Sequence, residues 1–144
     1  MRFWDSSALV PLLVSEGASR GVLRELERDP AILAWWMTEV ECASAICRLE
    51  RDGSLSPDGL VEAIGRLSQL APSWQVIQPI PRVSVIAVRL LRTHPLRAAD
   101  ALQLAAAIEA AEQEPQTLPL VTLDERLARA AEREGFPVVS LDLD

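Results

Sequence analysis

Short apolar runs alternate along the whole chain with longer segments in which apolar residues recur every few positions. The short runs are typical of buried strands, and the wider spacing is typical of amphipathic helices. Strands that alternate with helices predict a parallel sheet covered by helices on both faces. The predicted strands are 3–4, 31–36, 74–80, 119–123 and 137–141, and the predicted helices are 8–14, 17–29, 38–51, 56–70, 82–93, 98–113 and 124–134.

The length of 144 residues predicts one domain, 1–144, large enough to bury a core. No apolar run approaches the length of a membrane span, and the N-terminus is not a secretory signal. We therefore expect a soluble, cytoplasmic protein with no membrane partner. Two cysteines, Cys42 and Cys47, are too few for a disulfide framework and are interpreted as small buried apolar residues.

The net charge is −7, and all 14 cationic side chains are arginines. This balance argues against nucleic-acid binding through a broad basic surface, because phosphate binding depends on Lys and Arg. It does not exclude a nucleic-acid substrate, since an acidic cluster that holds divalent metal reverses its local charge.

Asp5 follows the first predicted strand directly, and Ser6 follows it where a helix begins. Ligands of open α/β sheets bind beyond the carboxyl ends of the strands, which gives Asp5 the position of a functional acid. The alternative is that Asp5 or Ser6 caps the helix.

Glu41 lies in the first turn of the predicted helix 38–51. One interpretation is a capping box, in which Thr38 and Glu41 satisfy each other's backbone N–H groups. The other is a functional acid, because Ser44 and Ala45 share its helix face and leave room for a metal ion or water.

Two further acids have similar positions. Asp100 lies in the first turn of the most apolar predicted helix, and we expect it to point into the interior or a cleft. Asp124 follows a strand and precedes a helix, as Asp5 does. Structural alternatives are an interaction with the helix dipole for Asp100 and a helix cap for Asp124.

A parallel sheet would bring all four acids to one edge, where they would repel one another without bound cations. Oxygen ligands select hard ions such as Mg²⁺ or Mn²⁺, and such ions support hydrolysis of phosphodiesters. The sequence contains no zinc pattern, P-loop or glycine-rich dinucleotide loop, and it has a single histidine, His94.

The four acids lie in four short segments, 3–10, 40–45, 96–105 and 121–127. In order and spacing these segments together resemble the PIN-domain nucleases, and most closely the VapC-type toxins of toxin–antitoxin pairs. The resemblance implies a PIN-like three-layer α/β/α sandwich with a central, mainly parallel sheet. It also implies an endoribonuclease that depends on Mg²⁺ or Mn²⁺ and cleaves RNA, and a homodimer inhibited by a small antitoxin protein.

Asp5, Glu41, Asp100 and Asp124 align with the acidic quartet of this family. The resemblance implies that Asp5 and Asp100 are the principal metal ligands. Asp124 would bind directly or through water, and Glu41 mainly through water.

The same resemblance identifies three possible contacts to substrate or water, and one departure from the family. Ser6 and Thr122 align with polar residues beside the site, and Arg97 is a possible contact to phosphate, although a solvated role is the alternative. Gln103 stands where many relatives have histidine. Glu39 is the nearest competitor of Glu41 for the role of the second acid.

Two other families are excluded because both rely on a lysine, which this sequence lacks. They are the haloacid-dehalogenase-like phosphatases, which also begin with a strand that ends in Asp, and the response-regulator receiver domains, which are parallel sheets with clustered acids. A housekeeping PIN nuclease that processes RNA remains an alternative, as does a non-catalytic PIN-like module that binds RNA or protein. Trp35 and Trp36 are interpreted as strand core. The charged residues of 125–133 are interpreted as a solvated helix face.

Overall fold

The computed structural model describes residues 1–141, so the last three residues of the predicted domain 1–144 lie outside the described part. Four strands form one sheet in the order β3-β2-β1-β4, and every neighbouring pair is parallel. The predicted parallel sheet is therefore confirmed. The strands are β1 (Arg2–Trp4), β2 (Ile32–Trp35), β3 (Gln75–Ile77) and β4 (Leu120–Val121).

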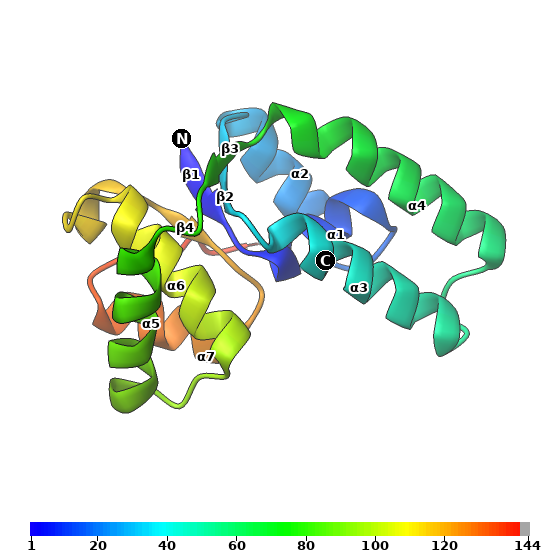
Figure 1. Cartoon of the computed structure of the whole chain (residues 1–144). Helices are drawn as coiled ribbons and strands as arrows, with labels where there is room; N and C mark the ends of the chain where they lie inside the picture. Colours follow the sequence, from blue (N-terminus) through cyan, green and yellow to red (C-terminus); the bar gives the residue numbers. More distant parts are fainter. Residues whose placement is uncertain (142–144) are drawn as a thin grey trace.

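Helices cover both faces of this sheet, which makes the fold a three-layer α/β/α sandwich (Figure 1). The first four helices pack on one face and the last three on the other. The α-helices are α1 (Ser6–Leu13), α2 (Ser19–Arg28), α3 (Thr38–Arg51), α4 (Pro57–Leu70), α5 (Pro81–Thr93), α6 (Ala98–Ala110) and α7 (Glu125–Arg133), with short 3-10 helices η1 (Ala71–Ser73) and η2 (Pro115–Thr117).

The strands are short, and their successive residues fill two separate apolar cores. In β1, Phe3 packs with α5, α6 and α7, whereas Trp4 packs with the first four helices, and both are fully buried. Leu120 and Val121 of β4 divide in the same way. This alternation follows from the two-residue period of a strand, and it leaves the carboxyl ends of the strands free to carry polar groups.

Local signals explain why most helices begin and end where the sequence predicts. Ser56 accepts a hydrogen bond from the backbone N–H of Gly59 at 3.0 Å, and Pro57 is the first residue of α4. Gly53 ends the preceding segment with a φ of +85°, a conformation that glycine adopts without strain.

Several predicted boundaries are wrong. The predicted strand 74–80 ends at Ile77, and the predicted helix 8–14 is Ser6–Leu13 in the structure. Within the predicted strand 137–141 only Val138 forms a bridge, to Leu120, so the segment extends the sheet by a single contact. The predicted helix 98–113 ends at Ala110, because Glu112 and Gln113 have positive φ values of 51° and 64° that no α-helix contains.

The two adjacent tryptophans have different environments. Trp35 is 4% exposed and belongs to the core, as predicted, but Trp36 is 52% exposed, so its interpretation as strand core is wrong. The reason is that β2 ends at Trp35 and the chain turns before α3. Cys42 is buried as expected, whereas Cys47 is partly exposed.

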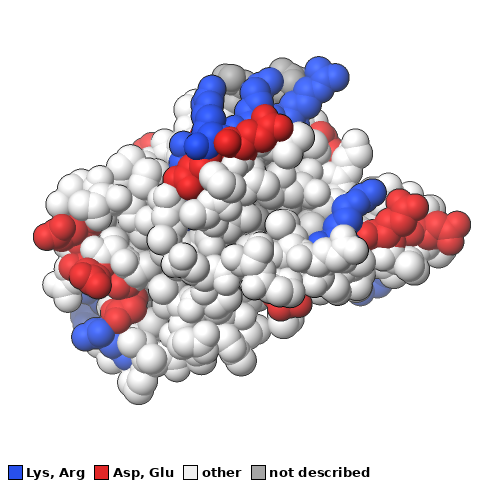
Figure 2. Space-filling model, turned by 90° about the horizontal axis from the view of Figure 1, so that it is seen from above, with Lys and Arg blue, Asp and Glu red and all other residues white. Residues whose placement is uncertain are grey.

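Figure 2 shows the molecule from the side where β1 begins, at the top of Figure 1. The middle of this face is free of charged side chains, and arginines and acids gather at its margins. This face therefore offers no broad basic surface. Within residues 1–141 no helix is both long enough and apolar enough to cross a membrane.

Candidate functional site

Asp5 lies between β1 and α1 and is 3% exposed. Its carboxylate caps α1 by accepting the backbone N–H of Ser7 at 3.3 Å. It also accepts hydrogen bonds from the hydroxyls of Ser7 and of Thr122, the latter at 2.9 Å. Asp5 is therefore both the helix cap and a buried acid with several donors, so the two interpretations of this residue are compatible.

Ser7 links the first and last parts of this network, and the sequence interpretation did not single it out. Its Oγ accepts the backbone N–H of Leu123 at 2.9 Å while its proton goes to Asp5. Thr122 likewise accepts the backbone N–H of Asp124 at 3.1 Å while donating to Asp5. Because each hydroxyl has one proton, both protons go to Asp5, and this favours its ionised form.

Glu41 lies in the first turn of α3 and does not form the predicted capping box. Met37 is the N-cap of α3 and makes no side-chain capping bond, so Thr38 is already inside the helix. The Glu41 carboxylate instead accepts hydrogen bonds from Ser6 Oγ at 3.0 Å and from Gln103 Nε2 at 2.9 Å. The cap interpretation of Glu41 is therefore wrong, and its carboxylate faces α1 and α6.

Gln103 takes the position at which the resemblance implies histidine in many relatives. It is fully buried in α6 and donates to Thr38 Oγ1 at 3.0 Å as well as to Glu41. Its Oε1 is buried without a partner in the described part of the chain. The amide thus orients the carboxylate of Glu41 from the opposite helix.

Asp100 and Asp124 occupy the first turn of α6 and the N-cap of α7. Asp124 accepts the backbone N–H groups of Arg126 and Leu127 at 2.8 and 3.1 Å, so the predicted cap is confirmed. The carboxylate of Asp100 makes no hydrogen bond or ion pair within residues 1–141. It is partly buried in the first turn of α6, whose buried side chains are apolar apart from Gln103.

One cavity of about 540 Å³ joins these elements. Three of the four acids line it directly, and the fourth, Asp5, lies behind Ser6 and Ser7, which also line it. Small side chains beside Glu41 keep the cavity open, as the sequence predicts. The lining residues are Ser6, Ser7, Val10, Val40, Glu41, Ser44, Ala45, Arg48, Arg97, Ala99, Asp100 and Asp124.

Burial, and after it the negative charge of neighbouring acids, raises the pKa of Asp5, Glu41 and Asp100. Burial raises the pKa of Asp5 above its ordinary value, against the hydrogen bonds from Ser7 and Thr122. Burial also raises the pKa of Glu41, and the charges of Asp5 and Asp100 add to the rise. For Asp100, burial raises the pKa first, and the negative charges of Asp124 and Asp5 follow.

Helix N-termini and arginines oppose this repulsion. All four acids stand at the N-terminal end of a helix, where the partial positive charge of the backbone stabilises a carboxylate. The nearby charges of Arg97 and Arg126 lower the pKa of Asp100, although burial outweighs them. Cys42 lies behind the acids, and burial raises the pKa of its thiol to about 12, so it does not supply a thiolate nucleophile.

The chemistry of these donors fits a hard divalent cation, because several carboxylate and hydroxyl oxygens surround one cavity that no lysine neutralises. Among residues 1–141, however, no three His, Cys, Asp or Glu side chains lie close enough together to hold a metal ion as they stand. The fit is thus one of ligand type and location.

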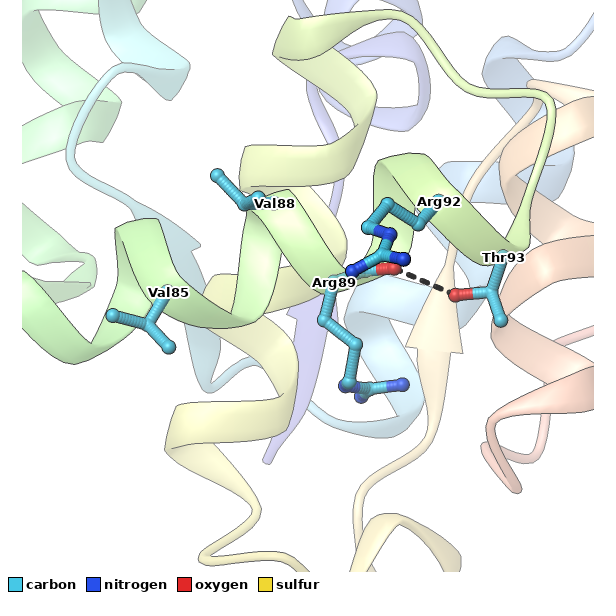
Figure 3. A pocket seen from close by; sticks show the side chains of 5 residues that line it. All are labelled: Val85, Val88, Arg89, Arg92 and Thr93. Atoms are coloured by element: carbon cyan, nitrogen blue, oxygen red, sulfur yellow. Dashed lines mark hydrogen bonds between the residues drawn. The ribbon is translucent and has the colours of Figure 1, made fainter.

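Another hollow, of about 510 Å³, lies on α5 and has a different character (Figure 3). Exposed Val85 and Val88 form its apolar part, and Arg89, Arg92 and Thr93 complete it. The hydroxyl of Thr93 donates to the backbone carbonyl of Arg89 at 2.7 Å. No carboxylate lines this hollow, so it is not a candidate for acid-based chemistry.

The sheet is parallel, and carboxylates line a cavity at the carboxyl ends of its strands. These two features define the class of protein, an α/β protein with an acidic site. Within that class, the chain belongs to the PIN domain family, whose sequence model matches residues 2–133. Among curated proteins no match was found.

Solved structures share this fold at low sequence identity. FitAcB from Neisseria gonorrhoeae superposes with a TM-score of 0.67 at 18% identity, over 97% of each chain. A toxin–antitoxin complex from Klebsiella pneumoniae gives 0.65 at 19% identity, again over 97% of each chain. VapC20 of Mycobacterium tuberculosis, a toxin that cleaves the sarcin-ricin loop, gives 0.66 at 18% identity, over 94% of this chain and 96% of its own.

The structure thus brings the four predicted acids and the three predicted contact residues together, in one network or around one cavity, whereas Glu39 is exposed and lies outside it. Arg97 lines the cavity, and Ser6 and Thr122 contact the acids. Sequence reasoning missed Ser7 and Arg48. A signal for Ser7 was its place two residues after a candidate cap, but Arg48 had none, since it is one of several charged residues near the end of α3.

Proposed function

We propose that this protein is a metal-dependent endoribonuclease that hydrolyses RNA phosphodiester bonds and acts as the toxin of a toxin–antitoxin pair. The observation that carries the proposal is the single cavity lined by Glu41, Asp100 and Asp124, with Asp5 buried behind it. Membership of the PIN domain family supports it. So do the structural neighbours, one of which is a toxin that cleaves an RNA loop.

Asp5, Asp100 and Asp124 would hold Mg²⁺ or Mn²⁺, with Glu41 binding mainly through water. A bound divalent ion would lower the pKa of water and stabilise negative charge on a phosphodiester. The raised pKa of three acids supports this assignment, because clustered carboxylates gain most from a nearby cation.

The side chains around the acids have separate tasks in this proposal. Ser7 and Thr122 hold Asp5 in place and favour its ionised form by donating to it. Ser6 and Gln103 orient the carboxylate of Glu41, so that it can accept a proton or position water in the cavity. Arg97 faces the same cavity and would contact a phosphate.

We further propose a small antitoxin protein as partner, and a homodimer as the active assembly. One structural neighbour is a toxin–antitoxin complex, and this supports an antitoxin partner. Another, FitAB, is described bound to a DNA fragment. Light scattering on the purified protein tests the homodimer. A mass of one chain at all concentrations would contradict it.

The decisive experiment incubates purified protein with a mixed structured RNA in Mg²⁺, Mn²⁺ or EDTA. We expect cleavage only with metal, and a loss of at least about 100-fold in rate for Asp5→Asn and Asp100→Asn. Equal cleavage in EDTA, or by both variants, would refute the proposal. RNA binding without cleavage in any metal would favour a non-catalytic PIN-like module.

Glu41 and Glu39 form a matched pair for the same assay. Both are in the first turn of α3, but Glu41 lines the cavity whereas Glu39 is exposed and outside its lining. We expect Glu41→Gln to lose cleavage and Glu39→Gln to retain it. The reverse result would assign the acid to Glu39.

A test in cells separates a toxin from a housekeeping nuclease. We expect induced expression of the wild type to stop bacterial growth and the Asp100→Asn variant to leave growth unchanged. Cleavage in the tube with unaffected growth would favour an RNA-processing enzyme.

A further inference from the structure

Arginines without an ion-pair partner gather around the acidic cavity. Arg48 and Arg97 line that cavity, and neither pairs with a carboxylate within residues 1–141. Arg126 and Arg133 on α7 do not line that cavity, but they too pair with no carboxylate within residues 1–141. Their guanidinium groups therefore retain free hydrogen-bond donors, which matters in a chain whose net charge is −7.

A separate hollow of about 140 Å³ collects the arginines of α7. Arg126, Arg129 and Arg133 all line it, since residues spaced by three and four share one helix face. They span about 10 Å along the helix, from a rise of about 1.5 Å per residue. We call these three residues the α7 arginine face. Of the three, only Arg129 has an ion pair with a residue in the described part of the chain, a loose 3.6 Å contact to exposed Glu125.

The back of this hollow is fixed by His94. Its side chain is 5% exposed and its Nε2 lies 2.9 Å from Oε2 of Glu134. Nδ1 of His94 is also buried. Because neither ring nitrogen is accessible, the arginines supply the contacts to any ligand in this hollow.

The hollow and the acidic cavity share two walls. The segment between α5 and α6 contributes Pro95 to the hollow and Arg97 to the cavity. The start of α7 contributes Arg126 to the hollow and Asp124 to the cavity.

We propose that the α7 arginine face binds the phosphodiester backbone of single-stranded RNA beside the scissile phosphate; this rests on the proposed nuclease function. Without bound metal the acids repel a phosphate beside them, so in metal-free protein the neighbouring phosphates must supply much of the binding free energy. The planar guanidinium fork matches phosphate oxygens. The charged face of α7, interpreted from sequence as solvated, is then a substrate contact.

The test measures binding of a fluorescein-labelled oligouridylate of about 12 nucleotides by anisotropy, in EDTA so that the probe stays intact. Arg126→Gln and Arg133→Gln are compared with Arg92→Gln. Arg92 is a matched control, because it is exposed on α5, lacks an ion pair within the described residues and lies in the other hollow (Figure 3). Circular dichroism checks that each variant folds.

We expect each α7 variant to weaken binding about three- to tenfold and to reduce the slope of log K against log salt by about 0.7, the value for one lost phosphate contact on a single strand. Arg92→Gln should change neither. Equal effects of all three variants, unchanged binding by the α7 variants, or no RNA binding by the wild type would each overturn the proposal. If the α7 variants bind RNA as the wild type does, an acidic protein partner becomes the alternative ligand of these arginines.

The cleavage assay is read separately. Binding that depends on α7 without any cleavage would refute the nuclease and retain the phosphate site. If the wild type cleaves RNA and the α7 variants bind and cleave it equally well, the nuclease function is retained and the phosphate site on α7 is refuted.

Discussion

Single residues of this site combine structural and chemical roles that a sequence presents as alternatives. Asp5 and Asp124 both cap helices, and both belong to the acidic network. A cap uses one carboxylate oxygen of Asp124, Oδ1, for both backbone bonds. Capping therefore leaves the other oxygen available, and the cap itself holds the acid in place.

The double role of Asp124 can be separated by two substitutions. Asp124→Asn keeps a capping oxygen and should change the free energy of unfolding by less than about 0.5 kcal/mol, while cleavage is lost. Asp124→Ala removes the cap and should lose about 1 kcal/mol as well. Urea unfolding and the cleavage assay measure the two effects. Equal stability of both variants would show that the cap contributes nothing.

Gln103 affords a second test at this scale. Its hydrogen bond lowers the pKa of Glu41 against the effect of burial, so Gln103→Leu should raise that pKa further. If ionised Glu41 is required, the acid limb of the pH profile of cleavage moves to higher pH. Gln103→His, which retains an N–H donor, serves as the control and should leave the limb near its original position. A profile unchanged in the leucine variant would argue against a role for this contact.

Elements of the fold are amphipathic because the sheet is covered on both faces. In α5, Val83 is 1% exposed and packs in the core, whereas Val85 is 70% exposed two residues further on. The helical period explains the difference, since residues two apart lie on different faces. The same helix thus has a stabilising face and an exposed apolar face (Figure 3).

This difference predicts unequal effects of the same substitution. Val83→Ala should lower the free energy of unfolding by about 2 kcal/mol through lost apolar burial and a residual cavity. Val85→Ala should change it by less than about 0.5 kcal/mol. Chemical denaturation at a low protein concentration measures both. A large loss for Val85→Ala would show that this valine is buried in solution.

In the folded molecule the acids at the carboxyl ends of the strands lie close together and repel one another when they are ionised. The pKa of Asp100 in the folded protein is raised, first by burial and then by the charges of Asp124 and Asp5. At pH values above the ordinary aspartate pKa near 3.8, Asp100 is therefore more protonated in the folded protein than in the unfolded chain. By linkage, the contribution of Asp100 to stability falls as pH rises through that window, up to the raised pKa.

Thermal unfolding of metal-free protein tests this consequence. Asp100→Asn, which is neutral at every pH, should raise the Tm at pH 7, and the gain should shrink toward zero as pH falls to about 4. Adding Mg²⁺ at pH 7 should raise the Tm of the wild type more than that of the variant. A variant less stable than the wild type at pH 7 would contradict the expectation that ionised Asp100 destabilises the metal-free protein.

Sequence alone determined the features that depend on short-range signals. The bounds of α3 and α4 follow from apolar periodicity and from caps within a few residues, and the predicted bounds differ from the structure by at most one residue. The positions of all four acids at the ends of elements follow in the same way.

Only the tertiary structure decided which groups meet. Thr122 donates to Asp5 across 117 residues, and Gln103 donates to Glu41 across 62. The exposure of Trp36 and the shared walls of the two hollows also depend on how distant elements pack. Local patterns set each element's period and ends, but side-chain partners depend on the free energy of packing elements that are far apart in the chain.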